Sequence, residues 1–151
     1  MLEQNTEVLI RISRSNDFLP VKQLLDDSHL PIEGVLDQFD NYFILENQNS
    51  EIIGCAGLEI YNQYGLLRSV VVRSEFQNKK FGSVLIQKME EFGKSKNVKE
   101  IYLLTETAEK FFSKHGYKEI QRDSVPKHIQ ESHEYSTACK VSAIVMKKQI
   151  F

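Results

Sequence analysis

Two lysines and a glycine stand between an apolar run and a segment with helical periodicity, in residues 75–86 (EFQNKKFGSVLI). The run at residues 70–72 predicts a buried strand, and the periodic residues that follow predict an amphipathic helix. A helix that follows a strand presents unpaired backbone N–H groups, which can bind a phosphate, and lysines would add positive charge. The stretch therefore predicts either a phosphate-binding loop or a solvated basic turn.

Charged side chains interrupt two of the apolar segments. Arg68 lies inside the strand predicted at residues 66–72, where a charge is costly unless it has a partner. It is either half of an internal salt bridge or a group that grips a carboxylate with two parallel hydrogen bonds. Glu59, on the neighbouring predicted strand, either acts as the base for an attacking amine or faces solvent. Ser142 is a further candidate for this pocket, or an ordinary strand residue.

The elements that must position these residues alternate between strands and helices. A turn at residues 47–50 predicts a hairpin, and a strand, helix and strand unit surrounds the lysine loop. Because no internal repeat or linker is present, we expect one domain over residues 1–151 with a mixed sheet, in the α/β or α+β class. Expected strands cover residues 8–12, 42–45, 52–60, 66–72, 101–104, 117–121 and 141–147. One helix is expected after the cap at residues 16–17, and a second, short helix has Val35, Leu36 and Phe39 on its apolar side. Further helices are expected at residues 81 to about 94 and 108–114, with a helical turn at 126–132.

Composition narrows the class of protein. The chain has 151 residues, 41% hydrophobic and 26% charged, which is typical of a soluble globular protein, and a net charge of -2 gives no general attraction to nucleic acid. The absence of a signal peptide and of a long apolar stretch predicts a cytoplasmic protein with no membrane partner. Cys55 and Cys139 are far apart, and the five-residue spacing of His128 and His133 does not place them on one face of a helix, so no metal site is expected.

Several segments together resemble a known family. The segments VVVRSEFQNKKFGSVLI, IYLLT and AEKFFSKHGY resemble the acyl-CoA-binding half of the GNAT superfamily of N-acetyltransferases. With IRISRSNDFLPVKQLL, IIGCAGLEIYNQYGLLRSVVV and VPKHIQESHEYSTACKVSAIVM, the resemblance extends over nearly the whole chain to the small N-acetyltransferases associated with arsenic-resistance operons. It also extends to the acetyltransferase domain of N-acetylglutamate synthases. It implies a central, mostly antiparallel sheet flanked by helices.

The resemblance also implies acetyl-CoA as cosubstrate, with a loop pattern Gln/Arg-x-x-Gly-x-Gly/Ala around the pyrophosphate. Gln77 and Gly82 match that pattern, but Lys80 replaces its middle glycine and can keep the glycine's role only if its backbone avoids a positive φ, which is costly for a residue with a Cβ. The family's tyrosine acid is replaced by Phe112, which leaves Tyr117, Tyr64 and Ser113 as substitutes. The implied CoA-binding residues are Val70, Val71, Val72, Gln77, Asn78, Lys79, Lys80, Phe81, Gly82, Ser83 and Phe112, and the pantetheine arm is expected to lie along the first three like an added strand.

The expected activity is transfer of an acetyl group to the primary amine of a small, amino-acid-like carboxylate, with Glu59 as base and Arg68 and Ser142 holding the substrate. Direct attack on the thioester would require neither a metal nor an acyl-cysteine intermediate. Two alternatives stay open: a CoA-binding module without catalysis, and an N-acetyltransferase that acts on proteins or peptides. A homodimer is also open as an oligomeric state.

Overall fold

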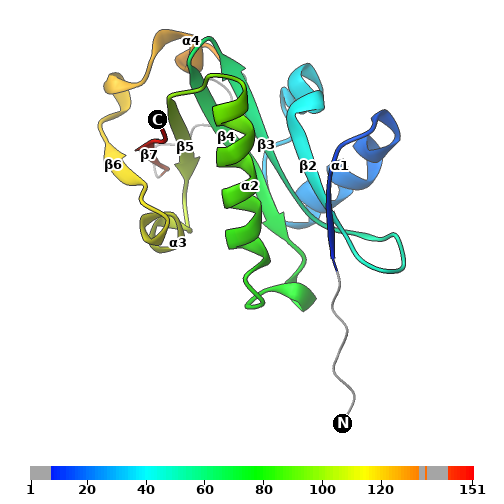
Figure 1. Ribbon diagram of the computed structural model, residues 1–151. Helices are drawn as coiled ribbons and strands as arrows, with labels where there is room; N and C mark the ends of the chain where they lie inside the picture. The colour runs from blue at the N-terminus through cyan, green and yellow to red at the C-terminus, as the bar shows by residue number, and fades with distance from the viewer. Residues whose placement is uncertain (1–7, 133–134, 136–142) are drawn as a thin grey trace.

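A single twisted sheet forms the centre of the molecule (Figure 1). The structure is a computed structural model, which describes residues 8–132, 135 and 143–151. The strand order is β1-β2-β3-β4-β5-β7-β6, and the β4–β5 pair is parallel whereas the other neighbouring pairs are antiparallel. The predicted fold class is therefore confirmed. The strands are β1 Leu9–Ile12, β2 Tyr42–Glu46, β3 Ile52–Tyr61, β4 Tyr64–Val72, β5 Glu100–Thr105, β6 Lys118–Ile120 and β7 Ile144–Gln149.

Helices cover both faces of the sheet. In Figure 1 the long helix α2 crosses the front of the central strands, and α1 lies behind β2 and β3. Among the helices of the described residues, none is long and apolar enough to cross a membrane. The α-helices are α1 Phe18–Asp27, α2 Phe81–Ser95, α3 Glu109–Lys114 and α4 Lys127–Gln130, and short 3₁₀ segments cover Ser15–Asp17, Val35–Asn41, Ser74–Phe76 and Arg122–Ser124.

The core divides by the face of the sheet, because successive strand residues point to opposite faces. Leu85, Ile86 and Met89 of α2 pack on one face, against strand residues that include Ala56 and Leu58. Val21, Leu24 and Leu25 of α1 pack on the other face, where Ile44 and Cys55 lie, and α4 contributes Ile129 to a third cluster with Leu66 and Tyr102. Burying such a leucine or isoleucine contributes about 1.5–3 kcal/mol each. The sheet is therefore packed against helices on both faces, which holds its strands in place.

An acidic side chain joins the first helix to the first strand. The Asp17 carboxylate accepts hydrogen bonds from Arg11 Nη1 and Nη2 at 2.7 and 3.0 Å and from the Arg14 backbone N–H at 2.7 Å. The Arg11 guanidinium, followed by the Arg14 N–H, lowers the pKa of this buried carboxyl. The Asp17 charge therefore ties the start of α1 to β1.

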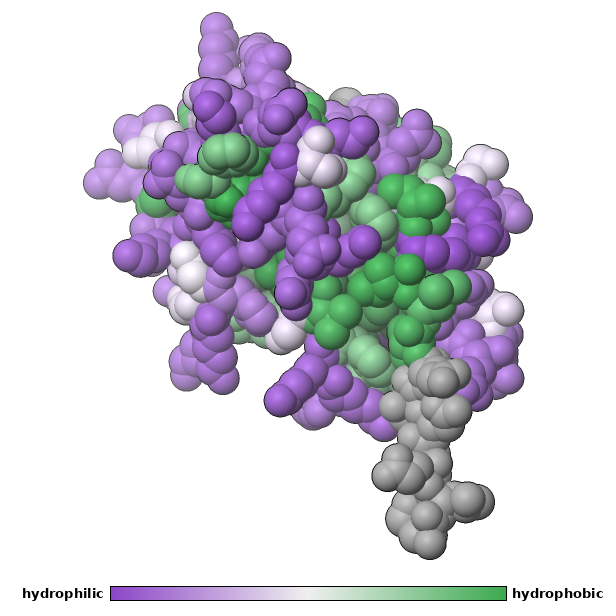
Figure 2. Space-filling model, viewed as in Figure 1, coloured by the Kyte–Doolittle hydropathy of each residue, from purple (hydrophilic) through white to green (hydrophobic). Residues whose placement is uncertain are grey.

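Apolar side chains also reach the surface beside α2. Figure 2 shows a mostly polar face with an apolar area over β1 and β2. Ile12 pairs with Phe43, whose side chain packs on the α2 face, and Ile12 itself is 44% exposed. The α2 layer therefore leaves the edge strand partly uncovered.

Some sequence predictions were wrong in detail. Leu36 was predicted to lie on the apolar side of a helix, but it is 62% exposed, because the segment is 3₁₀ and non-helical at Gln38 (φ -132°), which breaks the α-helical periodicity. The last strand was predicted at residues 141–147, whereas β7 is Ile144–Gln149 and residues 141–142 lie outside the described residues. The helical turn predicted at 126–132 is present as the short helix α4.

Candidate functional site

The sheet opens between its two parallel strands. β4 and β5 pair from Tyr64↔Glu100 to Leu67↔Leu103. Beyond that point β4 continues to Val72 and β5 to Thr105, without a further pair between them. The two strands therefore diverge in front of the α2 amino terminus, and backbone groups of β4 become available to a ligand.

Val70, Val71 and Val72 form the β4 side of this opening. The Arg73 N–H donates a hydrogen bond to the Ile53 carbonyl at 2.7 Å, so the Arg73 N–H points toward β3. Because backbone groups of a strand alternate in direction, the N–H and C=O of Val72, and those of Val70, point toward the open edge. The Gln77 side chain confirms this direction at one position, since its Nε2 donates to the Val72 carbonyl at 2.9 Å. The open edge has the form that an added extended ligand requires.

A loop with several unpaired N–H groups follows that edge. The first helical bond of α2 runs from the Val84 N–H to the Lys80 carbonyl at 3.1 Å. The N–H groups of residues 78–83 have no acceptor among the hydrogen bonds of the described residues. These donors stand at the positive end of a 15-residue helix, beside the exposed side chains of Lys79 and Lys80. The arrangement is chemically suited to bind an anion such as a diphosphate.

The Lys80 backbone does not meet the condition set for it in the sequence. Lys80 is the N-cap of α2 and has φ 67° and ψ 14°, in the left-handed region that is costly for a residue with a Cβ. Asn78 is also left-handed, at φ 66°. The loop thus keeps the conformation that glycine adopts easily, at a cost of about 1–2 kcal/mol for a residue with a Cβ. A lysine at this position therefore adds a conformational cost to the loop.

Phe111 of α3 and His115, which follows it, support the start of α2, and neither was among the predicted site residues. A Cβ added at Gly82 would lie 3.1 Å from Phe111 Cζ, so glycine permits close packing of the two helices here. Ser83 Oγ is hydrogen-bonded to His115 Nε2 at 3.1 Å, and the His115 ring lies 4.9 Å from that of Phe111. Gly82 and Phe111, like Ser83 and His115, are separated by about thirty residues in sequence, so no local pattern could have found these contacts.

The aromatic position that replaces the family's tyrosine lies in the core. Phe112 is 7% exposed and its ring packs 5.9 Å from that of Tyr117. The Tyr117 hydroxyl donates to Glu90 at 3.0 Å, and burial raises the pKa of Tyr117. Tyr64 accepts a hydrogen bond from Gln63, and Ser113 lies on the exposed side of α3. These surroundings favour a packing role for Phe112 and Tyr117.

Glu59 and Arg68 lie together. Arg68 Nη1 donates to Glu59 Oε2 at 2.8 Å, and Arg68 Nη2 donates to the Pro31 carbonyl at 3.2 Å. The Tyr61 hydroxyl donates to Glu59 Oε1. Both charged residues are 3% exposed, so the solvent-facing alternative for Glu59 is wrong and the salt bridge left open for Arg68 is present. Burial, with the Glu59 hydrogen bond, raises the pKa of the half-buried Tyr61, which therefore stays protonated at neutral pH. Tyr61 was not among the predicted site residues.

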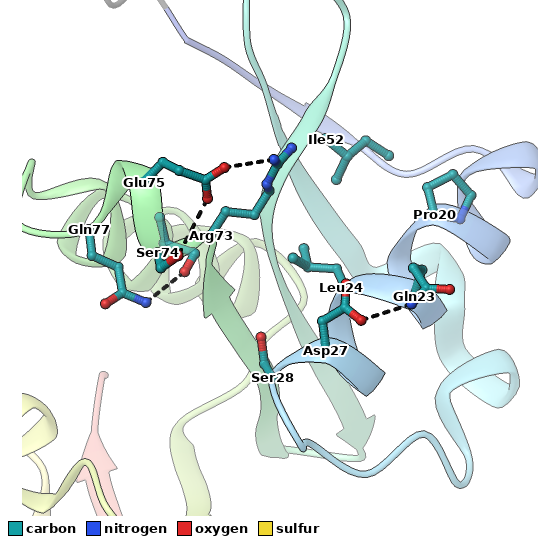
Figure 3. A pocket seen from close by; sticks show the side chains of 11 residues that line it. Pro20, Gln23, Leu24, Asp27, Ser28, Ile52, Arg73, Ser74, Glu75 and Gln77 are labelled. Atoms are coloured by element: carbon teal, nitrogen blue, oxygen red, sulfur yellow. Dashed lines mark hydrogen bonds and ion pairs between the residues drawn. The ribbon is translucent and has the colours of Figure 1, made fainter.

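A separate pocket of about 430 Å³ borders the beginning of the loop (Figure 3). It lies between α1, with Gln23 and Asp27, and the carboxyl end of β4, with Arg73 and Gln77. No residue of β5 lines this pocket. It adjoins the opening between β4 and β5, because Val72 and Gln77 line the pocket and also lie at the open edge.

Within the described residues, the cysteine and histidine side chains form neither a reactive thiol nor a metal site. Cys55 is fully buried, its thiol donates to the Ser69 carbonyl at 3.3 Å, and burial raises the pKa of Cys55 to about 12. No group of three or more potential metal ligands occurs in the part of the chain that the structure describes. Ser142, Cys139 and His133 lie outside the described residues, so the predicted role of Ser142 stays a prediction.

Comparisons with known proteins agree with this arrangement. A model for the "Acetyltransferase (GNAT) family" matches residues 9–117. An uncharacterized N-acetyltransferase of Chlorobaculum tepidum is 30% identical over 99 residues, which are 65% of this chain and 63% of that protein. An amino-acid acetyltransferase of Vibrio atlanticus is 26% identical over 111 residues, which are 72% of this chain and 25% of that protein.

Among solved structures, the N-acetylglutamate synthase from Neisseria gonorrhoeae, complexed with coenzyme A and N-acetyl-glutamate, is similar at a TM-score of 0.82. The match covers 98% of this chain and 36% of that chain at 16% identity, so it shows the fold. This chain spans less than two thirds of the length of each of these three proteins.

Proposed function

The chain belongs to the acetyltransferase (GNAT) family, and from this premise we propose that it transfers the acetyl group of acetyl-CoA to the primary amine of a small, amino-acid-like molecule. The observation that carries the proposal is the pair of features at the α2 amino terminus: the open edge of β4 and the unpaired N–H groups of residues 78–83. The first suits an extended pantetheine arm and the second suits a diphosphate. The residues present therefore fit acetyl-CoA.

The loop and β4 would hold the cosubstrate in place. Backbone N–H groups of residues 78–83 would bind the pyrophosphate, and Lys79 and Lys80 would add charge at its side. Gln77 would act indirectly, because its side chain bonds to Val72 and so fixes the loop against the strand end. Gly82 lets α3 support the loop closely. Most of this binding comes from the backbone, which explains why Lys80 is tolerated in place of glycine.

Glu59 is the proposed base, and the contacts around it suggest the route of the proton. The Tyr61 hydroxyl already donates to Glu59, so it can take a proton from the substrate ammonium while it passes its own to the carboxylate. Arg68 is bonded to Glu59 and its side chain is fully buried, which supports a role in orienting the carboxylate. The predicted grip of Arg68 on a substrate carboxylate would require this pair to rearrange.

The amine would attack the thioester directly. Cys55 is an unsuitable acyl carrier, because burial keeps its thiol protonated and out of reach. The leaving thiolate, with a pKa of about 8.5 for a free thiol, leaves without a dedicated acid, so Phe112 does not prevent the reaction. The class of amine is supported by the similarity to amino-acid acetyltransferases.

A thiol-release assay tests the proposal. The protein is incubated with acetyl-CoA and a panel of amino acids, their decarboxylated analogues and a control peptide, and free CoA thiol is measured. Release with amino acids supports the proposal, whereas release with the peptide alone would indicate a protein acetyltransferase. CoA should also raise the melting temperature more than pantetheine, since only CoA carries the phosphates. A CoA shift without release by any amine would indicate a binding module.

A further inference from the structure

A strained serine lies where β4 separates from β5. Ser69 has φ 60°, although it is inside a strand and only 6% exposed. The register between β3 and β4 passes from Cys55↔Val71 to Gly57↔Arg68, so Ala56 opposes two residues, Ser69 and Val70. This is a β-bulge, and it begins two residues beyond the last β4–β5 pair, at Leu67. The bulge and the opening therefore coincide.

Two neighbouring strands hold Ser69 in this conformation. The Tyr42 and Ser69 hydroxyls are hydrogen-bonded at 2.8 Å, and the Cys55 thiol donates to the Ser69 carbonyl at 3.3 Å. Tyr42 is on β2, so its ring must cross β3 to reach β4. It crosses at Gly57, where an added Cβ would lie 2.3 Å from Tyr42 Cε1 and Cζ. The absence of a side chain at Gly57 thus lets the Tyr42 hydroxyl reach Ser69.

We propose that the Tyr42 hydroxyl is a positioning group for the cosubstrate: by holding Ser69 in the left-handed conformation, it sets the direction of the Val70 backbone at the open edge. A residue with a Cβ leaves this conformation unless its surroundings impose it. The next residue, Val70, presents its N–H and C=O to the opening, so a rotation at Ser69 would turn those groups away. This inference rests on the proposed function, because the ligand along the edge is acetyl-CoA.

Three variants test the inference through the dissociation constant of CoA, measured by calorimetry. Tyr42→Phe keeps the ring over Gly57 and removes only the hydroxyl, and it should weaken CoA binding by roughly 3- to 10-fold, the range expected for one neutral hydrogen bond. Ser69→Ala removes the other hydroxyl and should weaken binding to a similar degree. The double variant Tyr42→Phe/Ser69→Gly should return to within about twofold of wild type, because glycine adopts a positive φ without help.

Tyr102→Phe is the matched control. The Tyr102 hydroxyl donates to Glu100, also on β5, at 2.7 Å, so this change too removes one tyrosine hydrogen bond. Tyr102 is 3% exposed and is therefore as buried as a matched control requires. CoA affinity should be unchanged in this control. Any one of three results would overturn the inference. These are unchanged CoA affinity in Tyr42→Phe, an equal loss of affinity in Tyr102→Phe, and a double variant Tyr42→Phe/Ser69→Gly whose affinity stays as low as that of Tyr42→Phe.

Amide hydrogen exchange of the ligand-free protein separates this inference from the proposed function. Tyr42→Phe should speed exchange at Ser69 and Val70 more than at residues of β7, and Ser69→Gly should reverse that change. If wild-type protein does not bind CoA, the proposed function fails and the exchange result alone decides whether Tyr42 holds the bulge. Unchanged exchange at both residues would show that it does not.

Discussion

Replacing Lys80 by glycine should make the protein more stable and its CoA binding weaker. Lys80 is left-handed at φ 67°, a conformation that costs a residue with a Cβ about 1–2 kcal/mol and costs glycine little. Glycine loses about 0.5–1 kcal/mol more conformational entropy on folding, so the net gain in the free energy of unfolding is about 0.5–1 kcal/mol. For a chain of this size that gain raises the melting temperature by about 1–4 °C.

The affinity should change in the opposite direction. An exposed ion pair is worth roughly 0.2–1 kcal/mol, so Lys80→Gly should raise the dissociation constant of CoA about 1.5- to fivefold. The dependence of affinity on salt should also fall, because one charge fewer faces the phosphates. Calorimetric titration at two salt concentrations measures both quantities, and thermal unfolding without ligand measures stability.

Lys79→Ala is the control for charge alone. It removes a neighbouring cation of the loop at a residue that is not among those with a positive φ. We expect its affinity to fall as in Lys80→Gly without the gain in melting temperature. If Lys80→Gly lowers the melting temperature, the strain argument is refuted, and if it binds CoA as tightly as wild type, the charge argument is refuted.

Three further changes test other parts of the site. Cys55→Ala should leave kcat at saturating acetyl-CoA within about twofold of wild type, because the buried thiol carries no acetyl group. Since that thiol also bonds to the Ser69 carbonyl, any loss should be in CoA affinity, and isolation of an acetylated cysteine competent to acetylate the amine would contradict the prediction. Glu59→Gln should lower kcat by roughly 10²–10⁴-fold and remove the acid limb of the pH–rate profile, with CoA affinity near normal. It should also lower the free energy of unfolding by about 3–5 kcal/mol, since Arg68 is left buried without its counter-charge. If stability falls but each folded molecule keeps the wild-type kcat, the Glu59–Arg68 pair has a structural role and Glu59 is not the base. Asp17→Asn should destabilise by about 1–3 kcal/mol at neutral pH. Because the folded pKa of Asp17 is lowered, that stabilisation is present above the unfolded value of about 3.9 and is lost as pH falls through the folded pKa, so unfolding curves of the two proteins should converge in acid.

The sequence by itself determined the order of the elements and the position of the loop. Helix α2 begins at Phe81, as the spacing of its apolar residues predicts, and a strand ends at Val72 just before the loop. Both features are local, because apolar periodicity and turn-forming residues act over neighbouring positions of the chain. The family resemblance depends on the same continuous stretches and was confirmed with them.

Only the tertiary structure decided what the polar side chains do. Arg68 could have gripped a ligand or paired internally, and the choice depended on β3 placing Glu59 within 2.8 Å of it. Ser69 takes a backbone conformation that its residue type disfavours, because hydrogen bonds from Tyr42 and Cys55 outweigh a local cost of about 1–2 kcal/mol, and Lys80 is also left-handed. Tyr42 reaches Ser69 across Gly57 over 27 residues of sequence. Contacts of this kind arise from the register and layering of the sheet, which are properties of the whole fold.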